Sequence, residues 1–190
     1  ARQEQTLPAE VEEFLAAGSP PIVFTPGSAN TDAASFFVAA VAACQHLDRR
    51  GVLLTKYTEQ LPERLPPTVK HLGFVPLSQI LPRAAAFIHH GGIGSCAQGL
   101  AAAVPQLVRP LSFDQFDNVM RLRRLGVADE LSVRRFTPQK VAAALERLLS
   151  SPEVAKECRQ RAARCDGDAA LNRAADALEG IAPGSRSIGA

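Results

Sequence analysis

Short apolar runs alternate with longer segments whose apolar residues recur at helical spacing along most of this chain. The short runs are typical of buried strands, and the longer segments are typical of helices with one apolar face. The runs that predict strands are 21–26, 51–56, 69–75, 85–90 and 106–110. Helices are predicted over 31–48, 77–84, 95–103, 114–125, 137–150 and 152–180. This alternation predicts an α/β, Rossmann-like parallel sheet with helices on both faces.

The same pattern predicts the domain organisation. We expect residues 1–20 to form a linker or leading helix, 21–180 to form one domain, and the Gly/Ser-rich residues 181–190 to form a flexible tail. The Asp-Gly-Asp triplet at 166–168 interrupts the last helical segment, and we interpret it as a helix-breaking loop.

The composition is that of an ordinary globular protein, with 46% hydrophobic and 21% charged residues among 190. A net charge of only +2 gives no reason to expect a nucleic-acid or membrane surface as a partner. No apolar run approaches the roughly 20 residues that span a bilayer, and the polar start "ARQEQTLPAEVEEFLAAG" does not resemble a signal peptide. A cytoplasmic location is expected.

Cysteine usage favours a reduced, intracellular setting. The four cysteines contain no C-x-x-C pair, and Cys44 and Cys96 lie in apolar segments where a free thiol behaves as a small hydrophobe. No cysteine stands at ligand spacing from the adjacent His89 and His90, so neither zinc nor another metal is expected. No cofactor is expected either.

Candidate chemistry gathers where predicted strands end. The run "AAFIHHGGIGSCAQGL" (85–100) passes from a strand through His89, His90 and three glycines to a helix, and "PIVFTPGS" (21–28) passes through Gly27 and Ser28 in the same way. Glycines allow close backbone approach to a ligand, and a helix N-terminus attracts anions. Because carboxyl ends of parallel strands share one edge, these turns predict a phosphate site there.

A structural interpretation of the same residues stands beside the functional one. Ser95 and Gln98 match the S-x-x-Q capping box, which starts a helix without any ligand. A histidine at a strand end is often a satisfied edge residue. Asp114 and Gln115 follow the strand at 106–110 and could hold sugar hydroxyls, yet Asp114 also fits an ordinary helix cap.

The run "GFVPLSQILPRAAAFIHHGGIGSCAQGLAAAVPQLVRPLSFDQFDN" (73–118) resembles the nucleotide-sugar signature of GT-B glycosyltransferases. It is most similar to family 1, which includes plant UDP-glucosyltransferases and macrolide and sterol glucosyltransferases. Weaker similarity extends over almost the whole chain.

The resemblance implies roles for residues of the nucleotide-sugar donor site. His90, Ser28, Gly92, Gly94 and Ser95 would hold the diphosphate, with His90 in the place of the motif histidine. Phe74 would stack on the base, Val75 would pair with it through its backbone, and Gln98 would bind the ribose. Asp114 and Gln115 would bind hydroxyls of the transferred hexose. The residues so implied are Ser28, Phe74, Val75, His90, Gly92, Gly94, Ser95, Gln98, Asp114 and Gln115.

Three positions depart from the family pattern. Gln98 stands where many members have a glutamate, Leu77 replaces a common glutamine, and Phe74 replaces a tryptophan. The diphosphate part of the signature is therefore intact, whereas the nucleoside part is diluted.

The resemblance implies that the chain is the C-terminal half of an inverting glycosyltransferase that moves a hexosyl group from a UDP- or dTDP-sugar to a hydroxyl of a small or lipophilic acceptor. The catalytic base would lie on an N-terminal acceptor-binding domain, so this chain alone is expected to bind the donor without transferring sugar. Its exposed interdomain face could drive self-association. The alternatives are the donor-binding subunit of a two-chain transferase and a non-catalytic or epimerase-type nucleotide-sugar protein.

Overall fold

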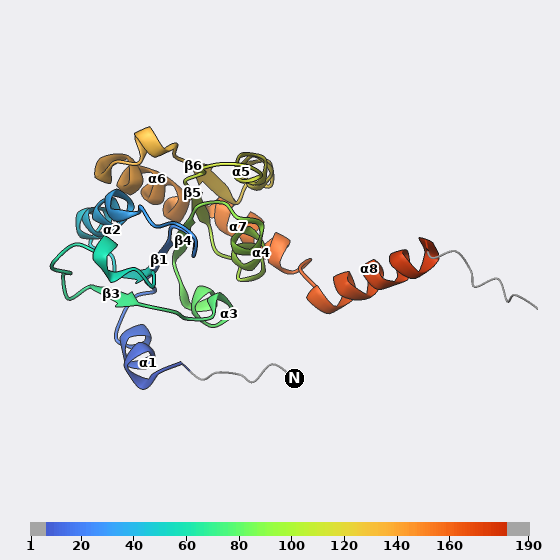
Figure 1. Cartoon of the computed structure of the whole chain (residues 1–190), viewed down its shortest axis with the longest axis horizontal. Coiled ribbons are helices and arrows are strands. Elements are labelled where there is room, and N and C mark those ends of the chain that lie inside the picture. The colour runs from blue at the N-terminus through green and yellow to red at the C-terminus, as the bar shows by residue number, and fades with distance from the viewer. Residues whose placement is uncertain (1–6, 182–190) are drawn as a thin grey trace, which may run out of the picture.

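One parallel sheet of six strands organises the computed structural model, which describes residues 7–181 (Figure 1). The strand order is β3-β2-β1-β4-β5-β6, and all five neighbouring pairs are parallel. The strands are β1 (Ile22–Thr25), β2 (Gly51–Leu54), β3 (Val69–Leu72), β4 (Ala86–His89), β5 (Gln106–Val108) and β6 (Ala128–Glu130).

Helices connect the strands and cover the sheet. The α-helices are α1 (Ala9–Ala16), α2 (Ala34–His46), α3 (Leu77–Ile80), α4 (Ile93–Ala101), α5 (Gln115–Arg124), α6 (Pro138–Ser150), α7 (Pro152–Ala162) and α8 (Gly167–Ile181). Three 3₁₀ turns are η1 (Thr58–Gln60), η2 (Leu81–Arg83) and η3 (Val133–Arg135). Helix α8 extends away from the rest of the molecule (Figure 1).

Alternating side chains of the central strands fill a core on each face of the sheet. Phe24 and Ile88 pack toward α2 and α6, whereas Val23 and Phe87 pack on the opposite face with α1 and α3. Successive strand residues point to opposite faces, so a strand covered on both sides reads as a continuous apolar run. The predicted α/β architecture is confirmed.

Several predicted boundaries were wrong. The strands stop one to three residues before the predicted ends, so Phe74 and Val75 lie beyond β3 in the turn that follows it. Strand β6 was missed because its residues are polar and half-buried, as suits the edge of a sheet. Helix α4 begins at Ile93 rather than Ser95. Gly92 occupies its N-cap, and the predicted capping box of Ser95 and Gln98 does not form.

The remaining predictions concern the two ends of the chain. Helix α1 lies within the predicted leading segment 1–20. The helical segment is interrupted, but at 163–166 rather than at the predicted 166–168, because α7 ends at Ala162 and α8 already begins at Gly167. The Asp166 carboxylate accepts a bond from the Ala169 N–H in the first turn of α8. The predicted tail, 181–190, lies outside the described residues except for its first position.

The order of the strands reverses between β1 and β4. Strand β1 pairs with β2 on one side and with β4 on the other, so the connections leaving β1 and β4 run to opposite faces. In open α/β sheets this switch point opens a crevice beyond the carboxyl ends of the strands. The two glycine turns identified in the sequence follow these two strands.

Candidate functional site

A hollow of about 360 Å³ lies at the carboxyl ends of β1, β2, β3 and β4. It contains no carboxylate among its lining residues, which suits an anionic ligand. The lining residues are Thr25, Gly27, Ser28, Leu54, Thr55, Lys56, Tyr57, Gly73, Phe74, Val75, Leu77, His90 and Ser95.

Half of the implied donor-site residues meet in this hollow. Ser28 comes from the turn after β1, and Phe74 and Val75 come from the turn after β3. His90 comes from the turn after β4, and Ser95 from the first turn of α4. The implied residues that do not line it are Gly92, Gly94, Gln98, Asp114 and Gln115. Side chains far apart in the sequence thus meet because their strands end at the same edge of the sheet. Ser28 and Ser95 are 67 positions apart.

The turn after β4 presents free backbone donors to the hollow. Gly91 has φ +92°, in the region that favours glycine. The first hydrogen bond of α4 runs from the Cys96 N–H to the Gly92 carbonyl at 3.0 Å. The N–H groups of Ile93, Gly94 and Ser95 precede it and have no carbonyl partner within the helix. These donors and the positive end of the helix dipole can stabilise an anion.

His90 lies between two glycines that leave room for its ring. A Cβ on Gly27 would come within 2.9 Å of the ring, and a Cβ on Gly92 within 2.5 Å of Nε2. The Nδ1 atom of His90 is buried and has no hydrogen-bond partner. Burial lowers the pKa of His90, against the opposing charge of Asp114. Burial therefore favours the neutral ring in the ligand-free protein.

His89 points into the core, away from the hollow. Its side chain is 0% exposed, its Nδ1 accepts the Gly91 N–H at 3.0 Å, and its Nε2 lies 2.9 Å from Gln106 Oε1. Since Nδ1 accepts, Nε2 carries the proton and donates to Gln106. Burial lowers the pKa of His89 to about 3. The two adjacent histidines thus differ in their surroundings: His90 lines the hollow, and His89 holds the turn from the core side.

Aromatic and cationic side chains from the ends of β2 and β3 also line the hollow. Phe74 is 80% exposed there and free to stack on a planar ligand. Lys56 and Tyr57 follow β2, and the Lys56 ammonium lies 4.9 Å from the Tyr57 ring centroid. Sequence reasoning missed both residues, although they stand at a strand end on the same edge of the sheet. Gln98 is exposed on α4, outside the hollow.

Asp114 and Gln115 stand at the start of α5, beside the turn after β4 rather than in the hollow. Asp114 occupies the N-cap position, yet its side chain makes no capping bond, so the predicted cap is not formed. Its Oδ2 accepts instead from Asn118 Nδ2 at 2.8 Å. Gln115 Oε1 accepts the N–H groups of Leu111 at 2.8 Å and Ser112 at 3.2 Å, which closes the loop that precedes the helix.

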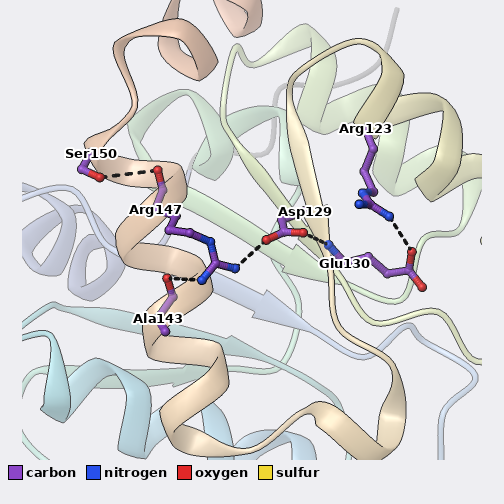
Figure 2. A network of polar contacts seen from close by, with 6 residues as sticks. All are labelled: Arg123, Asp129, Glu130, Ala143, Arg147 and Ser150. Atoms are coloured by element: carbon purple, nitrogen blue, oxygen red, sulfur yellow. Dashed lines mark hydrogen bonds and ion pairs between the residues drawn. The ribbon is translucent and has the colours of Figure 1, made fainter.

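A second hollow, of about 230 Å³, lies at the edge strand β6. Figure 2 shows its charged residues: Arg147 of α6 bonds Asp129 at 2.8 Å, and Arg123 of α5 bonds Glu130 at 3.5 Å. Burial acts to raise the pKa of Asp129, but the bonds from Arg147 and the Glu130 N–H hold it below its ordinary value. Arg135 also lines this hollow, but both of the hollow's carboxylates are already paired with arginines, and we assign it no ligand.

Residues 7–181 lack two features that other classes of function need. No group of three or more His, Cys, Asp or Glu side chains there is placed to hold a metal ion. In the same range, no helix combines the length and apolar character needed to cross a membrane. The cysteines at 44, 96 and 158 are buried and free, whereas Cys165 is exposed.

Residues 38–173 match the family model described as "Erythromycin biosynthesis protein CIII-like, C-terminal domain". Oleandomycin glycosyltransferase of Streptomyces antibioticus is 33% identical over 160 residues, which cover 83% of this chain and 37% of that protein. O-mycaminosyltylonolide 6-deoxyallosyltransferase of Streptomyces fradiae is 32% identical over 157 residues, 80% of this chain and 36% of that protein.

Solved structures give the same result. The glycotransferase of kitacinnamycin superposes with a TM-score of 0.76 at 29% identity, covering 86% of this chain and 43% of that one. The chain thus spans less than half the length of each of these three proteins.

Proposed function

We propose that this chain binds the nucleotide-diphosphate-sugar donor of a family 1 glycosyltransferase. The chain belongs to the family of such enzymes described as "Erythromycin biosynthesis protein CIII-like, C-terminal domain". One observation carries the proposal: the hollow at the β1/β4 switch point is free of carboxylates and is lined by Ser95, in the first turn of α4, where backbone N–H groups have no partner within the helix. A diphosphate suits these donors.

The diphosphate and the base of the donor would each lie against residues that line the hollow. The diphosphate would lie against Ser28, His90 and Ser95, with the backbone of Gly92 and Gly94 close by. Glycine at these two positions lets the ligand approach the backbone without meeting a Cβ. A uracil or thymine base would stack on Phe74 and pair with the backbone of Val75.

In the intact enzyme, we propose that a hexosyl group passes from a UDP- or dTDP-sugar to a hydroxyl of a small or lipophilic acceptor, with inversion. The acceptor's oxygen attacks the anomeric carbon and the diphosphate leaves, while a base on the N-terminal domain removes the hydroxyl proton. The role of this chain is to stabilise the charge that develops on the departing diphosphate, through the α4 N–H groups and His90.

Three features stay predictions. We expect no metal or cofactor in the reaction, a cytoplasmic location, and self-association through the face that meets the N-terminal domain. Gln98, in the place of a glutamate, is expected to bind the ribose less strongly than a carboxylate would.

Calorimetric titration with UDP, dTDP and UDP-glucose tests the proposal. Wild-type chain should bind at least one of these nucleotides, and His90→Ala should weaken that binding about tenfold, or about 1.4 kcal/mol. His46→Ala, an exposed change at the end of α2, is the matched control and should bind like wild type. Absence of nucleotide binding, or equal affinity of wild type and His90→Ala, would contradict the proposal.

A further inference from the structure

Asn118 is the last residue of the glycosyltransferase-like motif. Its side chain connects Asp114 with the turn after β4, two parts of the site to which the resemblance gives separate roles. Its side-chain amide donates to Asp114 Oδ2 at 2.8 Å and to the Gly91 carbonyl at 2.9 Å. A carboxamide nitrogen has two protons, so both are used. One side chain therefore links the carboxylate expected to bind the hexose with the turn expected to bind the diphosphate.

The turn is a rigid point of attachment. The Gly91 N–H donates to buried His89, and the Gly91 carbonyl accepts from Cys96 Sγ at 3.4 Å in addition to Asn118. A Cβ on Gly91 would come within 2.9 Å of Val108, so the backbone also lies close against the core. Because this peptide is held on both sides, whatever Asn118 bonds is fixed relative to the diphosphate turn.

The bonds also decide which atoms of the hexose-binding pair remain available. With Oδ2 of Asp114 bound to Asn118, Oδ1 is left as an acceptor. With Oε1 of Gln115 bound to two backbone N–H groups, its amide nitrogen is left as a donor. Within the described residues neither of these two atoms has a hydrogen-bond partner, so the pair offers an acceptor and a donor to sugar hydroxyls.

We propose that Asn118 is a positioning residue of the donor site: it sets the Asp114 carboxylate at a fixed place relative to the diphosphate turn, and so sets the hexose relative to its leaving group. The proposal rests on the proposed function. The competing explanation is an ordinary side-chain pair one turn apart on a helix, which stabilises α5 by a small amount. That explanation does not involve Gly91 and affects no ligand selectively.

Titration calorimetry with UDP and UDP-glucose separates the two explanations. In Asn118→Ala, UDP-glucose affinity should fall about tenfold, while UDP affinity changes by less than about threefold. In an Asp114→Ala background, Asn118→Ala should cause no further loss for UDP-glucose, since the group that it positions is gone. Asn118→Ser keeps one donor proton and should give an intermediate loss; it also serves if Asn118→Ala does not fold.

Asp117→Asn is the matched control on the same helix. Asp117 bonds Arg121 on the exposed side of α5, so its replacement should leave both affinities unchanged. The inference would be overturned if Asn118→Ala lowered the affinities for UDP and UDP-glucose equally, or if Asp114→Ala left the UDP-glucose affinity unchanged. Either result would leave the proposed function intact. A wild-type chain that binds no nucleotide would overturn both.

Discussion

The turn after β4 and the loop after β5 both lead from a strand into a helix at the same edge of the sheet, but they are built differently. The first is set by buried groups: His89 is fully buried, and Gly91 lies against Val108. The second is exposed and held by the side chain of Gln115, with Phe113 90% exposed at φ +56°.

This difference separates stability from recognition. The core fixes the diphosphate turn, so changes there should cost folding free energy as well as affinity. Side chains on the surface fix the loop after β5, so changes there should alter which ligand binds with little effect on folding. The following substitutions test that separation, from the largest expected effect to the smallest.

Gly91→Ala should destabilise the fold most. A left-handed conformation costs an L-residue about 1–2 kcal/mol, and the contact of the new Cβ with Val108 at 2.9 Å adds overpacking of about 1–3 kcal/mol. Urea denaturation should show a total loss of about 2–5 kcal/mol. Gly94→Ala, whose Cβ would meet no atom within 4 Å, is the control and should be neutral or stabilising by up to about 1 kcal/mol. Equal stability of both variants would show that the core does not constrain the backbone of Gly91.

Buried His89 should make the folded state sensitive to acid. The pKa of His89 in the folded state, about 3, lies below the ordinary 6.5. Below about pH 6.5 the unfolded chain therefore binds a proton at this residue that the folded chain does not bind. The contribution of His89 to stability is therefore complete above about pH 6.5 and is lost as the pH drops, by about 2 kcal/mol at pH 5. His89→Thr should lack this component of the pH dependence, whereas His46→Asn on the surface should keep it. Urea titrations at several pH values measure the slope, and a wild-type slope in His89→Thr would show that another group is responsible.

Phe113→Gly should have the smallest effect and the opposite sign. Glycine relieves the left-handed backbone at this exposed position but makes the unfolded chain more flexible, which leaves a gain of about 0.5–1 kcal/mol or less. Phe116→Ala, exposed on α5, should change stability by less than about 0.5 kcal/mol. Thermal denaturation compares the two. A loss of more than about 1 kcal/mol in Phe113→Gly would mean that the loop contributes to folding as the β4 turn does.

The apolar pattern predicted the sheet because its central strands are buried on both faces. It failed at β6, where Ala128, Asp129 and Glu130 are half-buried at an edge and leave no apolar signal. It also extended β3 to Val75, since the hydrophobic residues of the binding turn continue the pattern of the strand. Apolar side chains that line a hollow cannot be told from core residues by sequence spacing alone.

The candidate site was predictable where glycines and histidine mark a turn, and less so elsewhere. His90, Ser95 and Ser28 were identified from their place after strands and from the resemblance. The roles of His89 and Asn118 depend on hydrogen bonds to Gly91, which no spacing rule contains. Lys56 could have been found in the same way as His90, because it lies just beyond the carboxyl end of β2.

The main hollow has few fully charged side chains, and this should limit how strongly nucleotide affinity depends on ionic strength. Among its lining residues, Lys56 and His90 are the side chains that can carry positive charge, and burial favours the neutral ring of His90. An anion held by N–H dipoles at contact distance is attracted over a short range, well inside the Debye length of about 10 Å at 0.1 M salt. Nucleotide affinity should therefore depend only weakly on salt. The chain should still bind its ligand at salt concentrations that release anions from an arginine-rich surface.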